Sequence, residues 1–198
     1  MKRMLVDEIV ESYENDGTIR TSRSGDDVLE VVLRSISGTV RFNATTIQRH
    51  TVLVHSWYVG ILASELAPEG LKDMARLAGM MHDFGETVVG DFVMPVKSGR
   101  LFGDVYRTYY EPLEKAFRSF VGNNVIGIRD FDARYASVEE YVTEADSIIG
   151  EIELYGDTMD MDDETREHVN NLFKEMDDSV SNELFVGTLK ELSEKIGN

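Results

Sequence analysis

The sequence contains no cysteine, which excludes a disulfide framework and a thiolate metal site. Any metal must therefore be held by His, Asp, Glu or backbone oxygen. Long apolar runs are also missing, since no uninterrupted stretch approaches the roughly 20 residues of a membrane span. The N-terminus has no long apolar core before its first acids, Asp7 and Glu8. We therefore expect no signal peptide and no membrane association, and a cytoplasmic location.

Positive charge is scarce: 20 Lys and Arg residues oppose 37 Asp and Glu residues, giving a formal net charge of -17. Binding a nucleic-acid backbone requires a basic surface, so we expect no nucleic-acid partner. A small phosphorylated ligand remains compatible with this charge, because a bound cation and a few local Arg or Lys side chains can override the global field.

The 198 residues suit a single domain with a sizeable core. We place this core at about 26–155 and an acidic helical extension at about 156–198. Apolar residues recur at helical spacing, and no run of alternating strands is evident, so the fold class is predicted to be all-α. Expected helices cover about 1–13, 26–36, 51–66, 71–81, 106–120, 138–155, 163–176 and 182–196.

Three details of this helix assignment can be checked. Asp26 or Asp27 is expected to cap the helix that runs to about 36. Residues 122–132 are expected to form an irregular connection. The last two helices are expected to be peripheral, covering the core or forming a subunit contact. Apolar positions such as Leu189 and Leu192 lead us to expect a homo-oligomer.

The stretch from His82 to Asp91 contains several side chains that can bind a metal ion or accept a proton. An adjacent His82-Asp83 pair closes an apolar run, and Glu86 and Asp91 follow. Imidazole and carboxylate suit a divalent first-row metal, and a nearby carboxylate can handle a water proton. Adjacent residues in mid-helix point in different directions, so the pair can bind one ion only where the helix ends, which we expect at Gly85. The alternative is an ordinary helix end with solvated acids.

Two further residues stand among apolar neighbours. His55 lies inside the apolar helix at 51–66, where a histidine by itself is more often a core residue than a ligand. Asp146 lies among the apolar positions of the helix at 138–155. A buried carboxylate needs a partner, and the alternative is that Asp146 lies at a solvated edge.

Together, His55, His82, Asp83 and Asp146 resemble the H…HD…D pattern of the HD-domain metal-dependent phosphohydrolases. Residues 82–97 are similar to the HD-x-x-E-x-x-x-G-D-x-x-x-P-x-K block of 5′-deoxynucleotidase-like HD proteins of bacteria and phages. Within this branch, the compact phage proteins that hydrolyse dATP are the closest likeness.

The resemblance implies an HD-domain helical bundle in which these four residues hold one divalent transition metal, Mn, Co, Fe or Zn. It also implies that Glu86 positions or deprotonates the attacking water and that Asp91 accepts a hydrogen bond from the sugar 3′-OH. Arg41 and Lys97 would hold phosphate oxygens. Phe42, which replaces the tryptophan usual in the branch, would pack against the sugar or base.

The function implied is hydrolysis of dATP to deoxyadenosine and triphosphate. Its purpose would be to deplete dATP in the host cytoplasm for a phage with 2-aminoadenine in its DNA. A 5′-deoxynucleotidase acting on monophosphates is the nearest alternative. A triphosphate requires more cations, such as Lys97, Arg100 and Arg107, or additional Mg²⁺ on the phosphate tail. A non-catalytic nucleotide-sensing HD module is the second alternative.

Overall fold

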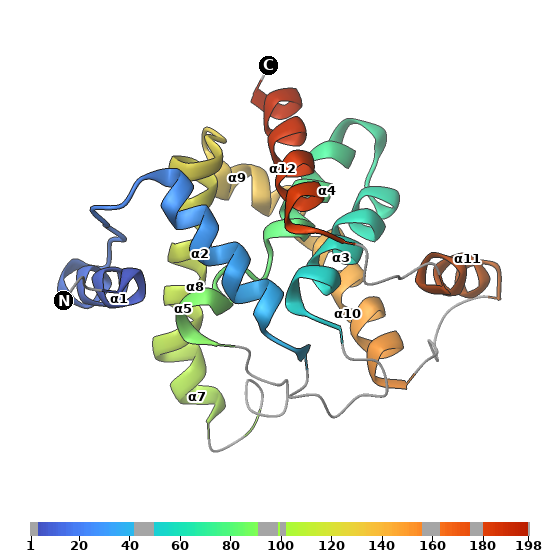
Figure 1. Cartoon of the computed structure of the whole chain (residues 1–198). Helices are drawn as coiled ribbons and strands as arrows, with labels where there is room; N and C mark the ends of the chain where they lie inside the picture. The colour runs from blue at the N-terminus through green and yellow to red at the C-terminus, as the bar shows by residue number, and fades with distance from the viewer. Residues whose placement is uncertain are drawn as a thin grey trace.

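The computed structural model describes residues 4–41, 50–90, 99, 102–155, 163–174 and 180–197. Within these ranges the chain is helical and contains no strand, and an isolated antiparallel bridge joins Val40 to Thr51. The predicted all-α class is therefore confirmed (Figure 1). The elements are α1 Leu5–Asp16, α2 Gly25–Gly38, α3 Val52–Leu66, η2 Glu69–Leu71, α4 Lys72–Met81, α5 Glu86–Val89, α7 Gly103–Val105, η3 Tyr106–Tyr110, α8 Glu111–Phe120, η4 Val121–Ile126, α9 Phe131–Ala136, α10 Glu139–Tyr155, α11 Asp163–Lys174 and α12 Asn182–Gly197.

Helix α3 lies at the centre of the fold, and α4 and α10 pack against it (Figure 1). Its apolar side chains point to several sides of the helix, and most of them are buried, including Val52, Val59 and Leu62. A helix that is apolar on more than one side is stable only when neighbours cover it. The density of apolar residues in the sequence therefore determines the central position of this helix.

Two glycines allow α3 and α4 to approach closely. A Cβ atom on Gly79 would lie 2.7 Å from the Cα atom of Gly60, and one on Gly60 would lie 2.8 Å from the carbonyl oxygen of Arg76. Both contacts are with backbone atoms, which cannot rotate away, so larger residues would push the helices apart. Gly60 follows His55 and Gly79 precedes His82, and the close crossing thus brings the two histidines together.

The N-terminus of α2 differs in detail from the sequence prediction. Ser24, rather than Asp26 or Asp27, is the capping residue. Its hydroxyl accepts a hydrogen bond from the Asp27 backbone N–H at 3.2 Å, and the Asp27 carboxylate accepts one from the Ser24 N–H at 3.3 Å. This reciprocal pair is a capping box, in which the acid occupies the third helical position instead of the cap.

The segment from Gly103 to Ile126 is one helical run that changes its hydrogen-bonding pattern. It begins with α7, widens into the π-helix η3, continues as α8 and ends in a second π-helix, η4. Part of the predicted irregular connection at 122–132 is therefore wrong, because residues 121–126 are helical and α9 follows at Phe131–Ala136. Wide turns of this kind often occur at functional sites.

The C-terminal helices make different contacts. Phe185, Leu189 and Leu192 of α12 are buried, and the helix packs on α4. Helix α11 lies at the margin of the fold (Figure 1). Its exposed His168 pairs with Glu65 of α3 at 2.9 Å. The apolar positions Leu189 and Leu192, which suggested a homo-oligomer, are thus occupied by contacts within the chain. In the described ranges, the helices are too short or too polar to cross a membrane.

Candidate metal centre

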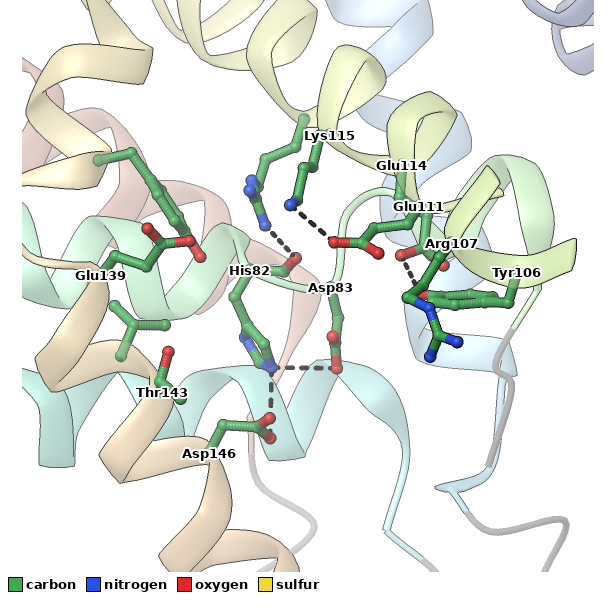
Figure 2. Close-up of a pocket in the computed structure, with 13 residues that line it drawn as sticks. His82, Asp83, Tyr106, Arg107, Glu111, Glu114, Lys115, Glu139, Thr143 and Asp146 are labelled. Carbon is green, nitrogen blue, oxygen red and sulfur yellow. Dashed lines mark hydrogen bonds and ion pairs between the residues drawn. The ribbon is translucent and has the colours of Figure 1, made fainter. Parts of the chain in front are cut away.

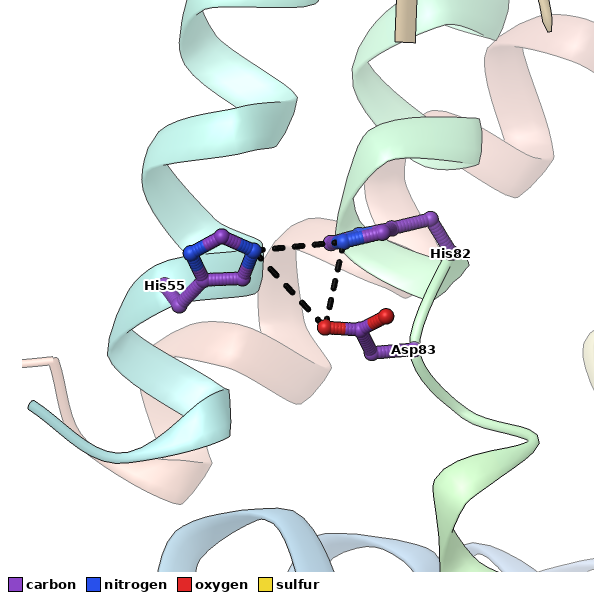
Figure 3. A group of neighbouring side chains, drawn as sticks. All are labelled: His55, His82 and Asp83. Carbon is purple, nitrogen blue, oxygen red and sulfur yellow. Dashed lines mark hydrogen bonds and ion pairs between the residues drawn. The ribbon is translucent and has the colours of Figure 1, made fainter. Parts of the chain in front are cut away.

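The four predicted ligands come from three helices and meet at one point. His55 lies in the first turn of α3, His82 and Asp83 directly follow α4, and Asp146 lies in the middle of α10. Figure 3 shows the imidazoles of His55 and His82 facing the Asp83 carboxylate. Atoms of these three residues lie within 4.8 Å of one another. Asp146 Oδ1 approaches the Nε2 atoms of His55 at 3.0 Å and His82 at 3.6 Å.

The distances among these atoms match those between ligand atoms bound to one metal ion. The two Nε2 atoms are 3.3 Å apart. Asp83 Oδ2 lies 3.1 Å from His82 Nε2 and 3.7 Å from His55 Nε2. Ligands at about 2.1 Å from a first-row metal lie about 3.0 Å apart at right angles and about 3.4 Å apart at the tetrahedral angle. The residues therefore fit a divalent transition metal held by two imidazoles and two carboxylates.

Helix α4 does not end at Gly85, where the sequence pattern predicted its end. Helix α4 ends at Met81, before the His82-Asp83 pair, and Gly85 has a right-handed helical conformation with φ -59°. Gly85 therefore does not end the helix through glycine-specific backbone angles. A Cβ atom on Gly85 would lie 2.6–2.8 Å from Cβ, Cα and carbonyl oxygen atoms of Glu114. Its missing side chain lets the turn at 82–85 press against α8.

Both imidazoles are oriented by an acceptor on the side away from the ion position. His55 Nδ1 lies 3.1 Å from Glu153 Oε2, and His82 Nδ1 lies 2.7 Å from the Gly79 carbonyl oxygen. A carboxylate and a carbonyl oxygen can only accept, so both Nδ1 atoms must donate hydrogen. In a neutral ring the lone pair is then on Nε2, the nitrogen that faces the ion position.

The charges of the site favour a bound cation. Arg41 lies 3.2 Å from Asp83, 3.5 Å from Glu153 and 3.9 Å from Asp146, and the charge of buried Glu86 also acts on it. One guanidinium thus faces four carboxylates. A divalent cation offsets part of this excess negative charge, which is costly in a buried site.

In the metal-free protein, these carboxylates favour protonated imidazoles. Burial by itself lowers the pKa of His82, but Asp83 and Asp146 outweigh burial and raise this pKa to about 10. Burial and the charge of Arg41 lower the pKa of His55, yet Glu153 and Asp146 raise it overall. A metal ion would take the place of these protons, because ligating nitrogens must be deprotonated.

The remaining predicted residues fall into two groups. Arg41 joins the carboxylates of the metal centre, as described above. Glu86 is buried at 6% exposure, and its backbone N–H donates to the Asp83 carbonyl oxygen at 3.0 Å, so the two acids are one turn apart. Phe42, Asp91 and Lys97 lie outside the described residues.

A cavity of about 410 Å³ lies beside the metal centre (Figure 2). His82, Asp83 and Asp146 line one side of it. The exposed fraction of the ligand side chains rises from 0% for His55 to 38% for Asp146. The centre is thus closed on the α3 side and open toward the cavity, from which a substrate can approach.

The cavity carries cations and acids that sequence reasoning largely missed. Of its cations, Arg107 was named as a possible phosphate contact, whereas Lys115 and Arg118 were not. Lys115 pairs with Glu111 at 2.7 Å, and Arg118 donates to the His82 carbonyl oxygen at 3.2 Å. The lining residues outside the metal centre are Tyr106, Arg107, Glu111, Glu114, Lys115, Arg118, Tyr135, Glu139, Val142 and Thr143.

Comparison with known families agrees with this geometry. Residues 52–149 match the family model of the HD domain. The matched segment contains the four residues of the metal centre and Glu86. Neither the curated proteins nor the solved structures give a significant match.

Proposed function

We propose, from the premise that residues 52–149 form an HD domain and hence a metal-dependent phosphohydrolase, that the chain is a deoxynucleoside triphosphate triphosphohydrolase. The preferred substrate is dATP, and the products are deoxyadenosine and triphosphate. In a phage with 2-aminoadenine in its DNA, this reaction would deplete dATP. The base preference rests on the likeness to the compact phage proteins that hydrolyse dATP, and no individual residue carries it.

The observation that carries a triphosphate substrate is the cation content of the cavity beside the metal centre. Arg107, Lys115 and Arg118 line it together with His82, Asp83 and Asp146. The pairs of Lys115 with Glu111 and of Arg107 with Asp104 are partly exposed. Exposed pairs contribute about 0–1 kcal/mol, so both cations can exchange a carboxylate for a phosphate oxygen at small cost.

In the proposed reaction, a water oxygen forms a bond to the α-phosphorus and the bond from that phosphorus to O5′ breaks. His55, His82, Asp83 and Asp146 would hold the metal, which supplies Lewis acidity toward a phosphate oxygen. Glu86 accepts the proton of the attacking water. Arg41 and Lys97 hold phosphate oxygens. The O5′ atom of deoxyadenosine leaves with a proton from solvent, and Glu86 returns the proton that it accepted to solvent.

A 5′-deoxynucleotidase is the second candidate, because the same cavity also contains Glu111, Glu114 and Glu139. These acids disfavour a highly charged phosphate tail unless Mg²⁺ accompanies it. A monophosphate carries less charge and would need fewer cations.

Product analysis distinguishes the two. The protein is incubated with each dNTP, ATP and dAMP in ¹⁸O-labelled water with Mn²⁺, Co²⁺ or Mg²⁺, and the products are identified by mass spectrometry. The proposal predicts ¹⁸O-labelled triphosphate from dATP and unlabelled deoxyadenosine. Phosphate release from dAMP with no turnover of dATP would favour the nucleotidase, and no turnover at all would favour a nucleotide-binding module.

A further inference from the structure

Glu153 is a buried acid of α10 that the proposed reaction does not use. It lies seven residues after Asp146, about two helical turns, so both side chains are on the same side of the helix. The Glu153 side chain is only 2% exposed. A carboxylate at such a position must have partners that compensate for lost hydration.

Its partners are parts of the metal centre. Glu153 Oε2 accepts a hydrogen bond from His55 Nδ1 at 3.1 Å, and the same oxygen lies 3.5 Å from Arg41 Nε. His55 has no exposed side-chain surface, so bulk water has no access to its imidazole. The carboxylate thus fixes the ring of His55 from the side opposite the ion position.

We propose that Glu153 is a positioning residue that holds His55 in the tautomer and orientation required for metal binding. One helix would then supply both a ligand, Asp146, and the group that orients a ligand on α3. Acceptors behind metal-bound histidines typically change metal affinity or activity by about 10–100-fold. The inference depends on the metal centre and is independent of which nucleotide is hydrolysed.

An alternative explanation is that Glu153 attracts the cation merely through its negative charge. The two explanations differ in what Glu153→Gln does, since the amide oxygen can still accept from His55 while the charge is lost. The two explanations also differ in whether the effect of Glu153 on metal affinity requires His55. A positioning residue has no effect on metal affinity once the residue it positions is replaced, whereas a general field effect persists.

The test measures Mn²⁺ affinity from the electron paramagnetic resonance signal of free Mn²⁺. For Glu153→Leu, which has similar size but no acceptor, we expect binding about 10–100-fold weaker than for wild type. Exposed Glu151 on the same helix provides the matched control, Glu151→Leu. Equal affinities of the two variants would overturn the proposal.

Glu153→Gln separates hydrogen bonding from charge and also serves if Glu153→Leu loses its helical circular dichroism. We expect its affinity to stay within about tenfold of wild type, with an unchanged visible spectrum of the Co²⁺ form. A loss as large as that of His55→Gln would refute positioning through the hydrogen bond. In a His55→Gln background, a further loss of Mn²⁺ affinity caused by Glu153→Leu would also refute positioning through His55. Mn²⁺ binding without nucleotide hydrolysis would contradict the proposed function and leave this inference intact.

Discussion

Replacing Asp146 by alanine should strongly weaken metal binding while preserving the fold. Asp146 Oδ1 lies 3.0 Å and 3.6 Å from the two imidazole Nε2 atoms, so we propose it as one of four ligands. Its side chain is 38% exposed, and its loss therefore creates no buried cavity. Because such a position tolerates truncation, the melting temperature of the metal-free variant should stay within about 4 °C of wild type.

The magnitude follows from ligand linkage. If the variant binds Mn²⁺ about 100-fold more weakly, a concentration about 1,000 times the wild-type Kd stabilises wild type by about 4.1 kcal/mol and the variant by about 1.4 kcal/mol. For a chain of this size, each kcal/mol raises the melting temperature by about 2–4 °C. Mn²⁺ should then raise the melting temperature by about 8–16 °C in wild type and about 3–6 °C in Asp146→Ala.

Calorimetric melting with and without Mn²⁺ measures this difference. Glu144→Ala is the matched control, because Glu144 is an exposed acid on the same helix, and it should keep the full metal-induced increase. If Asp146→Ala gained as much stability from Mn²⁺ as wild type, the assignment of Asp146 as a ligand would be wrong.

Three further outcomes are expected. Glu86→Ala should bind Mn²⁺ like wild type but lower kcat by about two to four orders of magnitude, and an unchanged kcat would remove Glu86 from the mechanism. Gly79→Ala, whose Cβ would lie 2.7 Å from Gly60 Cα, should lower the free energy of unfolding in urea by about 1–3 kcal/mol. The control Gly187→Ala, whose Cβ meets nothing within 4 Å, should leave it unchanged. Wild-type stability of Gly79→Ala would contradict the close α3–α4 contact. In the metal-free protein, the pKa of His82 is raised to about 10. The stability contributed by protonated His82 is therefore fully present below pH 6.5 and is lost as pH rises toward 10. The melting temperature of chelator-treated protein should therefore fall across that interval, less so in His82→Ala, and a rise would contradict this protonation scheme.

The sequence predicted the parts of the fold that depend on local pattern. The apolar periodicity of α3, α4 and α10 gave their approximate bounds. The cap of α2 and the π-helical residues at 121–126 were missed. A cap depends on which of several neighbouring polar residues turns toward the backbone, and a π-turn depends on packing, so local composition does not distinguish the alternatives.

Some residues of the candidate site were also proposed from the sequence, whereas others were identified only in the structure. His55 and Asp146 were proposed as ligands because metal chemistry restricts the residue types and because their order resembles a known motif, and the structure places their side chains together. Glu153 was missed, although its spacing of seven residues from Asp146 could have indicated a shared face of α10. Lys115 and Arg118 belong to α8, and no local pattern connects them with the distant ligands.

The sequence alone therefore determined the helical class and indicated the candidate metal-binding side chains, because both follow from residue type and spacing. Only the tertiary structure decided how these side chains meet. The contact between Gly60 and Gly79 sets the distance between α3 and α4, and the contact of Gly85 with α8 sets the turn that carries His82 and Asp83. Such contacts join residues far apart in the chain, and their geometry depends on the packing of complete helices rather than on any local pattern.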